Sequence, residues 1–240
     1  DYLKQTFTNS KIFNFFKKDK RLLLYLFKSD ILIPDESIYN FIYSEQTVKN
    51  NRFHYGTFFY PEMKKIFGMK IQNEIEPNFI DNFELKREKG DNENFLCELI
   101  RLDSVQEFIE YLNNNKISQN STISPSIFES NLLLIKNDPT LIEYAAFYGS
   151  IQIFQYLRYS NADLSPFLWI YAIHGHNPEI IHLLEENKVY PPNSSFKYCL
   201  KEAIKCHHNE IATYLIDNIM YKDDVYNAYL NFEMNISSFF

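Results

Sequence analysis

The residues of this 240-residue chain best suited to chemistry are a few histidines and cysteines in its C-terminal half. Cys206-His207-His208 could assemble zinc ligands together with His182 or Cys199. However, no two cysteines have the Cys-x-x-Cys spacing of common zinc sites, and adjacent histidines on a helix point in different directions. We therefore interpret these side chains as ordinary turn residues and predict no metal site.

A nucleophilic enzyme would need Cys97, Cys199 or Cys206 beside an oriented histidine. All three cysteines lie in apolar helical sequence, where buried thiols are inert. His174-Gly175-His176 ends a predicted helix, a position at which a histidine also suits the helix dipole. Phosphate-binding glycine motifs do not occur among the 5 glycines. The sequence therefore predicts a non-enzymatic protein without a cofactor or a small-molecule substrate.

A pattern that occurs three times within residues 141–216 must position these side chains. Each copy has an alanine in a first predicted helix, a turn, and a second predicted helix that ends in leucine. Both positions advance by steps of 27 and 31 residues, at Ala145, Ala172, Ala203 and at Leu157, Leu184, Leu215. A repeat length near thirty residues is typical of stacked helix–turn–helix units.

The residue types explain why such units must stack. Alanine lets the next helical hairpin approach closely, and a single hairpin cannot bury its own apolar stripe. Proline in the segments 161–166 and 187–192 ends each second helix. We therefore predict an all-α fold, a helical-hairpin solenoid preceded by an N-terminal helical region.

This arrangement resembles the ankyrin repeat, most clearly over residues 141–161. The Ala-Ala-x-x-Gly run of ankyrin repeats corresponds to Ala145-Ala146-Phe147-Tyr148-Gly149, and the leucine-ending second helix to Ile153-Phe154-Gln155-Tyr156-Leu157. The Thr-Pro-Leu-His start of a standard repeat survives only as Thr140-Leu141-Ile142-Glu143. The steps are also shorter than the usual repeat of about 33 residues.

More specifically, the chain looks like the divergent ankyrin-repeat proteins expanded in parasitic protists, which carry an N-terminal helical domain of unknown function. Two short sequence motifs are similar to motifs of that family: Leu183-Leu184-Glu185-Glu186-Asn187 and Lys205-Cys206-His207-His208-Asn209. The resemblance implies degenerate ankyrin-like repeats that bind a protein partner and have no activity. It divides the chain into an N-terminal helical region (1–90), an ankyrin-like repeat domain (91–220) and a C-terminal capping helix or tail (221–240).

The N-terminal region has its own helix signals. Residues 11–28 predict two helices divided near the charged residues 17–21, and Pro34 begins a helix that extends to about residue 46. Residues 52–60 are rich in aromatic side chains and predict a loop that closes onto the core. The polar residues 70–94 form the predicted connection between the two regions. Further helices are predicted at 61–67, 95–112 (as two), 127–135 and 225–232.

Charge is distributed unevenly along the chain. Residues 1–90 carry 15 Lys or Arg and 12 Asp or Glu, a net +3, and residues 91–240 carry 9 and 19, a net −10, which together give −7. An acidic repeat surface repels phosphate backbones and favours basic partners. We therefore expect a protein partner and no nucleic acid.

Composition also bears on location. No apolar run approaches the ~18 residues of a membrane span, and three cysteines do not make a disulfide framework. A helix lying on a membrane surface is an alternative for residues 11–28, although no long polar face is evident there and burial is the favoured interpretation. We predict no membrane contact and a cytoplasmic location.

The ankyrin resemblance further implies which positions line a concave, partner-binding face: the exposed ends of the first helices and the fingers between repeats. An exposed aromatic side chain makes a good anchor, so the two aromatic positions matter most, and packing against the preceding finger is their alternative role. The implied residues are Asn137, Phe147, Tyr148, Leu164, His174, Ser195 and Lys205.

Two functional hypotheses follow. The first is an adaptor or scaffold that binds another protein through this face. The second is a structural subunit of a large cytoskeletal or ciliary assembly, in which the aromatic surface would be permanently covered.

Overall fold

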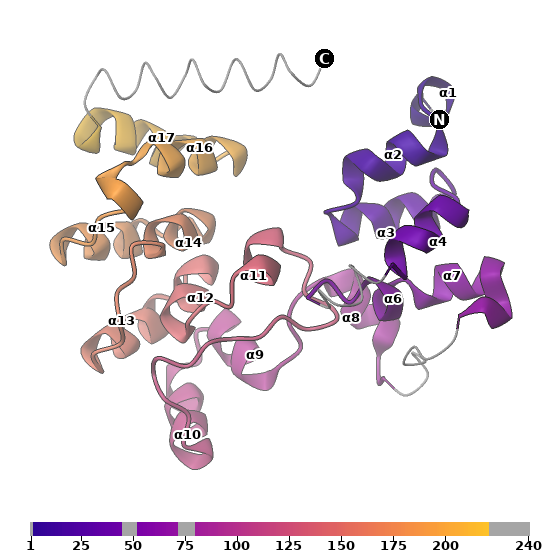
Figure 1. The fold of residues 1–240 in the computed structure, drawn as a ribbon. Coiled ribbons are helices and arrows are strands. Elements are labelled where there is room, and N and C mark those ends of the chain that lie inside the picture. Colours follow the sequence, from indigo (N-terminus) through magenta and orange to yellow (C-terminus); the bar gives the residue numbers. More distant parts are fainter. Residues whose placement is uncertain (1, 45–51, 72–79, 221–240) are drawn as a thin grey trace. The chain divides into compact units, whose positions relative to one another are not determined.

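The structure, a computed structural model, describes residues 2–44, 52–71 and 80–220, and its regular elements in these ranges are helices (Figure 1). An isolated bridge pairs Thr122 with Thr140, and no strand occurs in the same ranges. The predicted all-α class is therefore confirmed. The predicted tail at 221–240 and its helix at 225–232 lie outside the described residues. No helix of the described chain has both the length and the apolar composition needed to cross a bilayer.

The chain folds as two compact units. The first comprises residues 1–94 and 124–138, and the second comprises 95–123 and 139–240. The segment 124–138, which the sequence interpretation placed in the repeat region, thus belongs to the first unit. Its Phe128 packs edge-to-face on Phe83 at 5.5 Å, and Ser130 donates a hydrogen bond to the carbonyl oxygen of Gly90 at 2.7 Å.

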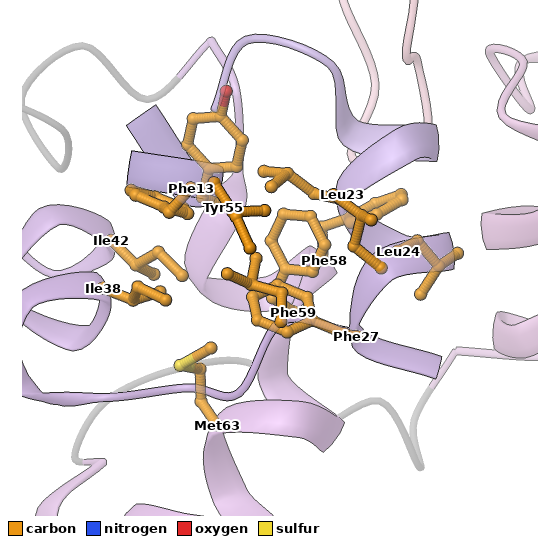
Figure 2. Packing of buried hydrophobic residues seen from close by; sticks show 13 residues of the cluster. Phe13, Leu23, Leu24, Phe27, Ile38, Ile42, Tyr55, Phe58, Phe59 and Met63 are labelled. Carbon is orange, nitrogen blue, oxygen red and sulfur yellow. The ribbon is translucent and has the colours of Figure 1, made fainter. Parts of the chain in front are cut away.

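The first unit has an aromatic core (Figure 2). Phe58 and Phe59 are fully buried in it, and their rings meet edge-to-face at 4.9 Å. Residues 52–60 do close onto the core as predicted, but Tyr55–Phe58 forms a helical turn where the sequence predicted a loop. The described helices are α1 (Tyr2–Thr6), α2 (Asn9–Phe16), α3 (Lys20–Lys28), α4 (Glu36–Ile42), α6 (Tyr55–Phe58), α7 (Tyr60–Phe67), the 3-10 helix η1 (Gly68–Lys70), α8 (Phe83–Lys89) and α11 (Leu132–Lys136).

Aspartates begin two of these helices. The Asp19 carboxylate accepts a hydrogen bond from the backbone N–H of Leu22 at 2.9 Å, and Asp35 caps α4 in the same way through Ile38 at 3.0 Å. Such caps satisfy N–H groups that have no partner inside the helix. The predicted division of residues 11–28 into two helices is confirmed, because α2 ends before this cap and α3 begins after it.

Among the described residues of the first unit, the cationic side chains of Lys20 and Arg87 are buried. Lys20 is fully buried, and its Nζ donates to the carbonyl oxygens of Ile127 and Glu129 at 3.0 and 2.9 Å. Arg87 of α8 is also fully buried and pairs with Glu62 at 2.6 Å. The polar stretch predicted as a connection therefore contains a helix that supplies a core residue.

The second unit is a stack of helix pairs (Figure 1). The first helices contact one another in the order α9, α12, α14, α16, and the second helices α10, α13 and α15 form a parallel set of contacts. The pairs are α9 (Phe95–Arg101) with α10 (Val105–Asn115), α12 (Leu141–Tyr148) with α13 (Ile151–Tyr159), α14 (Leu168–Gly175) with α15 (Pro178–Glu186), and α16 (Lys197–Lys205) with α17 (Asn209–Tyr214), which continues into the π-helical turn η4 (Leu215–Ile219).

Small residues allow the first helices to approach closely. The repeated alanines Ala145, Ala172 and Ala203 are all fully buried. A Cβ atom on Gly175 would lie 2.1 Å from the carbonyl oxygen of Ala146 and 2.8 Å from the backbone nitrogen of Gly149. The backbones of α12 and α14 therefore meet at a position where no side chain fits.

Hydrogen bonds join the turns of neighbouring pairs. Ser150 donates to the carbonyl oxygen of Ile100 at 2.6 Å, and the Asn177 amide donates to that of Gly149 at 2.9 Å. The Asp103 carboxylate accepts from the backbone N–H of Ile153 at 2.9 Å, at the N-terminus of α13. The first three pairs are thereby joined at the same edge of the stack.

Candidate functional site

A continuous row of contacting side chains crosses the first helices of all four pairs in the second unit. Phe147 and His174 belong to it because each stands two positions after a repeated alanine, and Lys205 is the third residue at that position. Stacked pairs place equivalent positions side by side. We call this set the cross-helix row; its members are Arg101, Tyr144, Phe147, Tyr148, His174, Glu202, Lys205 and Cys206.

The row begins with a cation on two tyrosines. The guanidinium of Arg101, the last residue of α9, lies 5.8 Å from the ring centroid of Tyr148. It also donates a hydrogen bond to the Tyr144 hydroxyl at 3.1 Å. The two tyrosine rings are 4.9 Å apart. At this end of the row, the Arg101 side chain therefore makes a cation–π contact and a hydrogen bond with two neighbouring tyrosines.

Phe147 connects this end to the next pair. Its ring meets Tyr148 edge-to-face at 5.0 Å and stacks on the His174 ring at 5.0 Å, with 24° between the planes. Phe147, Tyr148 and His174 are all half-buried. Each ring therefore packs against its neighbours and still presents part of its surface to solvent.

His174 then faces Glu202 of α16 and Cys206, the residue that follows this helix. Its Nε2 lies 3.1 Å from a carboxylate oxygen of Glu202, and the Cys206 sulfur lies 3.6 Å from Nδ1 and 3.8 Å from Nε2. The other oxygen of Glu202 accepts a hydrogen bond from Lys205 at 2.8 Å. Glu202 and Cys206 are four residues apart, so they project from the same face of the helix.

These contacts determine the charges of the row. Burial opposes the charge of His174, but the contacts with Cys206 and Glu202 outweigh it and raise the pKa of the imidazole to about 9. The hydrogen bond from His174 lowers the pKa of Glu202 to about 2, aided by Lys205 and opposed by burial. At neutral pH, His174 is therefore an imidazolium and Glu202 a carboxylate. With Arg101 and Lys205, the row carries three cations and one anion.

Two other histidines, His176 and His208, form a separate pair at the turns. His176 and His208 stack in parallel with ring centroids 4.1 Å apart, and His176 lies 3.4 Å from a carboxylate oxygen of Glu210. Burial, followed by the charge of His176, lowers the pKa of His208. The Cys206-His207-His208 motif therefore does not converge as a unit, because Cys206 faces His174 while His208 faces His176.

The predicted partner-binding residues separate into two groups. Phe147, Tyr148, His174 and Lys205 come together in the cross-helix row. Leu164 lies half-buried between α13 and α14, and Ser195 is half-buried directly after the 3-10 helix η3 (Pro192–Ser194). Asn137 belongs to the first unit, where its exposed side chain donates to the carbonyl oxygen of Leu133 at 2.9 Å.

Sequence reasoning missed four members of the row: Arg101, Tyr144, Glu202 and Cys206. Cys206 was weighed as a zinc ligand with its neighbouring histidines and His182 or Cys199, and as a nucleophile, but it was not paired with His174, against which the structure places it. The i, i+4 spacing of Glu202 and Cys206 puts an acid and a thiol on one helix face, but it does not show that this face lies against His174.

A separate cavity of about 480 Å³ lies at the last pair of the unit, lined by Trp169, Val189, Tyr190, Phe196 and Met220 among others. The Trp169 indole donates to the carbonyl oxygen of Val189 at 2.6 Å in its wall. Its lining extends to Met220, the last of the described residues.

Comparison with known proteins adds one finding. A family described as "Domain of unknown function (DUF3447)" matches residues 161–240, which include α14 to α17 and therefore His174, Glu202, Lys205 and Cys206 of the row. None of the curated proteins and none of the solved structures matches the chain.

Proposed function

We propose that the second unit is a degenerate ankyrin-like repeat module and that the protein is a non-enzymatic, cytoplasmic adaptor. The stacked helix pairs, with a small residue at each repeat of the first helix, support the ankyrin-like assignment. Cys97, Cys199 and Cys206 are all free thiols, as is usual in a reducing compartment.

The observation that carries the binding proposal is the cross-helix row itself. Phe147 stacks on His174 at the centre of four helix pairs, and both side chains keep part of their surface exposed. Trp, Tyr and Arg are enriched among the few side chains that dominate the energetics of protein interfaces, and aromatic rings bury a large area at a low entropic cost. A rigid array of these side chains on helices is suited to receive one segment of a protein partner.

The charge of the row refines the expected partner. The acidic balance of the C-terminal half favours a basic partner, whereas the row carries Arg101, His174 and Lys205 against Glu202. We therefore propose a partner that places an apolar or acidic segment on the row and basic side chains on the surface around it.

An affinity pull-down from native cell extract, with the full chain as bait, tests this function. We expect the Phe147→Ala/Tyr148→Ala variant to lose one specific protein that the wild type retains. The Lys205→Glu variant, which changes an exposed side chain, should weaken the same partner without disturbing the fold. Helical circular dichroism and a thermal melt establish that each bait is folded.

A matched control replaces two aromatic side chains outside the row, Tyr159→Ala/Tyr198→Ala, which are 73% and 69% exposed. This bait should recover the same partner as the wild type. A partner list that is the same for all four baits would contradict binding through the row.

A structural subunit of a cytoskeletal or ciliary assembly remains the second candidate. Exposed aromatic side chains favour it, since Tyr159, Phe167 and Tyr198 all lie on the surface of the second unit. Sedimentation separates the two candidates, because an adaptor is a soluble monomer and a lattice subunit stays with the insoluble fraction.

A further inference from the structure

Three side chains at the end of the cross-helix row offer different donor atoms to one point. His174 of α14 supplies a ring nitrogen, Glu202 of α16 a carboxylate oxygen and Cys206 a sulfur. These three atoms all lie within 4.8 Å of one another. In the described part of the chain, His174, Glu202 and Cys206 are the group of His, Cys, Asp or Glu side chains whose ligand atoms come this close together. We propose that they form a three-ligand site for Zn²⁺.

The separations fit a tetrahedral ion. Zinc bonds of 2.0–2.3 Å at tetrahedral angles place neighbouring ligand atoms about 3.3–3.6 Å apart. Nε2 of His174 lies 3.1 Å from the Glu202 oxygen and 3.8 Å from the Cys206 sulfur. Because the Cys206 sulfur also lies 3.6 Å from Nδ1, its side chain must rotate toward the Nε2 side of the ring for both residues to bind one ion. The ligand nitrogen in this arrangement is Nε2. The ion takes the place of the proton that Nε2 carries in the free site and of the Cys206 thiol proton, and both protons pass to solvent.

The surrounding residues hold the ligands in place. The Phe147 ring stacks on one face of the His174 ring, which limits its rotation. Lys205 hydrogen-bonds the Glu202 oxygen that is turned away from His174, at 2.8 Å. Partners of this kind orient metal ligands in known sites and affect affinity strongly.

The donor set selects the metal class. One thiolate, one imidazole and one carboxylate suit a borderline-soft ion, whereas Mg²⁺ and Ca²⁺ prefer oxygen ligands throughout. The His174 and Glu202 side chains are 16% and 22% exposed, so solvent reaches the site. Three protein ligands leave one coordination position for water or for a ligand from a bound partner.

The neighbouring histidine pair does not offer the same geometry. His176 and His208 are stacked with only 5° between their planes, so they present ring faces to each other instead of aiming nitrogens at one point. This pair therefore supplies the control for nonspecific binding by histidines.

Titration of the full-length chain with Co²⁺, followed by displacement with Zn²⁺, tests the site. We expect one equivalent of Co²⁺ to produce tetrahedral d–d bands and a thiolate-to-metal charge-transfer band, and one equivalent of Zn²⁺ to remove them. Cys206→Ser, a nearly isosteric change, should abolish the charge-transfer band. His174→Gln and Glu202→Gln should weaken Co²⁺ binding by more than about tenfold, and Lys205→Gln by about tenfold.

The His176→Gln variant is the matched control and should bind Co²⁺ like the wild type. A charge-transfer band that persists in Cys206→Ser would overturn the site, as would loss of binding in His176→Gln but not in His174→Gln. Circular dichroism confirms the fold of each variant. Should His174→Gln fail to fold, Cys206→Ser still decides the question.

Discussion

The two units treat buried charge in different ways. In the first unit, Lys20, Arg87 and Glu129 lie inside the core with almost no exposed surface. Among the described residues of the second unit, the buried acid is Glu143, and it belongs to a helix cap. Its carboxylate accepts hydrogen bonds from the backbone N–H of Thr140 and from the Ser165 hydroxyl.

In the described part of the first unit, several buried charged side chains have atoms without a hydrogen-bond partner. Within the described residues, the second carboxylate oxygens of Glu62 and Glu129 and the Nε of Arg87 have no hydrogen-bond partner. Burial lowers the pKa of Lys20 to about 7 and raises that of Glu129 to about 7, so each charge is disfavoured in the folded state. The first unit therefore depends on a few irregular polar contacts, each of which is costly to disturb.

The second unit depends instead on backbone approach repeated from pair to pair. Its alanines and Gly175 bring helices together, and its caps and turns satisfy polar groups at one edge. A surface carried by such a stack can vary in sequence without loss of the fold, which suits a recognition surface.

The largest effect is expected from Arg87→Ala in the first unit. This change removes the partner of Glu62 and leaves a half-buried carboxylate unpaired, so the free energy of unfolding should fall by about 3–5 kcal/mol. Arg52→Ala is the matched control, because Arg52 pairs with Asp138 at 2.7 Å on the surface and should cost less than about 1 kcal/mol.

Chemical denaturation measures both variants. Far-UV circular dichroism follows both units, and the fluorescence of Trp169, the one tryptophan of the chain, reports on the second. Equal losses for Arg87→Ala and Arg52→Ala would show that burial of the Arg87 charge is unimportant for the first unit.

An intermediate effect is expected from Gly175→Ala in the second unit. Helix propensity alone favours alanine by about 0.5–1 kcal/mol over glycine. The added Cβ would however meet the Ala146 carbonyl oxygen and the Gly149 nitrogen, which are backbone atoms and cannot rotate away. We expect the free energy of unfolding, followed by Trp169 fluorescence, to fall by about 3 kcal/mol. A stabilised variant would mean that α12 and α14 are not in close contact.

Sequence reasoning recovered the features that repeat. The alanine and leucine positions predicted the helix pairs of the second unit, and the repeated leucines Leu157, Leu184 and Leu215 are all buried as the apolar stripe requires. Periodicity works here because each helix buries a stripe that recurs with the helical period.

Features that depend on tertiary contacts were not recoverable. The polar sequence around Arg87 predicts a solvent-exposed connection, because nothing in the local sequence indicates that Arg87 forms an ion pair with Glu62. Gly175 reads as a turn residue, and only the neighbouring backbone shows why a side chain is excluded. His174, Glu202 and Cys206 meet across two repeats, so their contact depends on the stacking register, which spacing within one helix does not determine.

The smallest effect is expected from loss of a helix cap, and two threonines allow the units to be compared directly. Thr140 begins α12 with a reciprocal capping box, in which its hydroxyl accepts from Glu143 while Glu143 accepts from the Thr140 backbone. Thr8 caps α2 of the first unit through a hydrogen bond from Lys11 of 3.4 Å, the same length as the bond from Glu143 to the Thr140 hydroxyl, but Thr8 is exposed and its cap has no reciprocal bond. Thr140→Ala should lower the free energy of unfolding by about 1 kcal/mol, and Thr8→Ala by about 0.5 kcal/mol.

Thr140→Ala should also affect more than its own helix. Glu143 would keep its bond to the Thr140 backbone and to Ser165, but α12 would lose one of the two reciprocal bonds that fix its start. The effect is read from the Trp169 transition for Thr140→Ala and from circular dichroism for Thr8→Ala. A larger loss of unfolding free energy for Thr8→Ala would contradict this prediction. It would show that the cap of α2 in the first unit contributes more stability than the cap of α12 in the second unit.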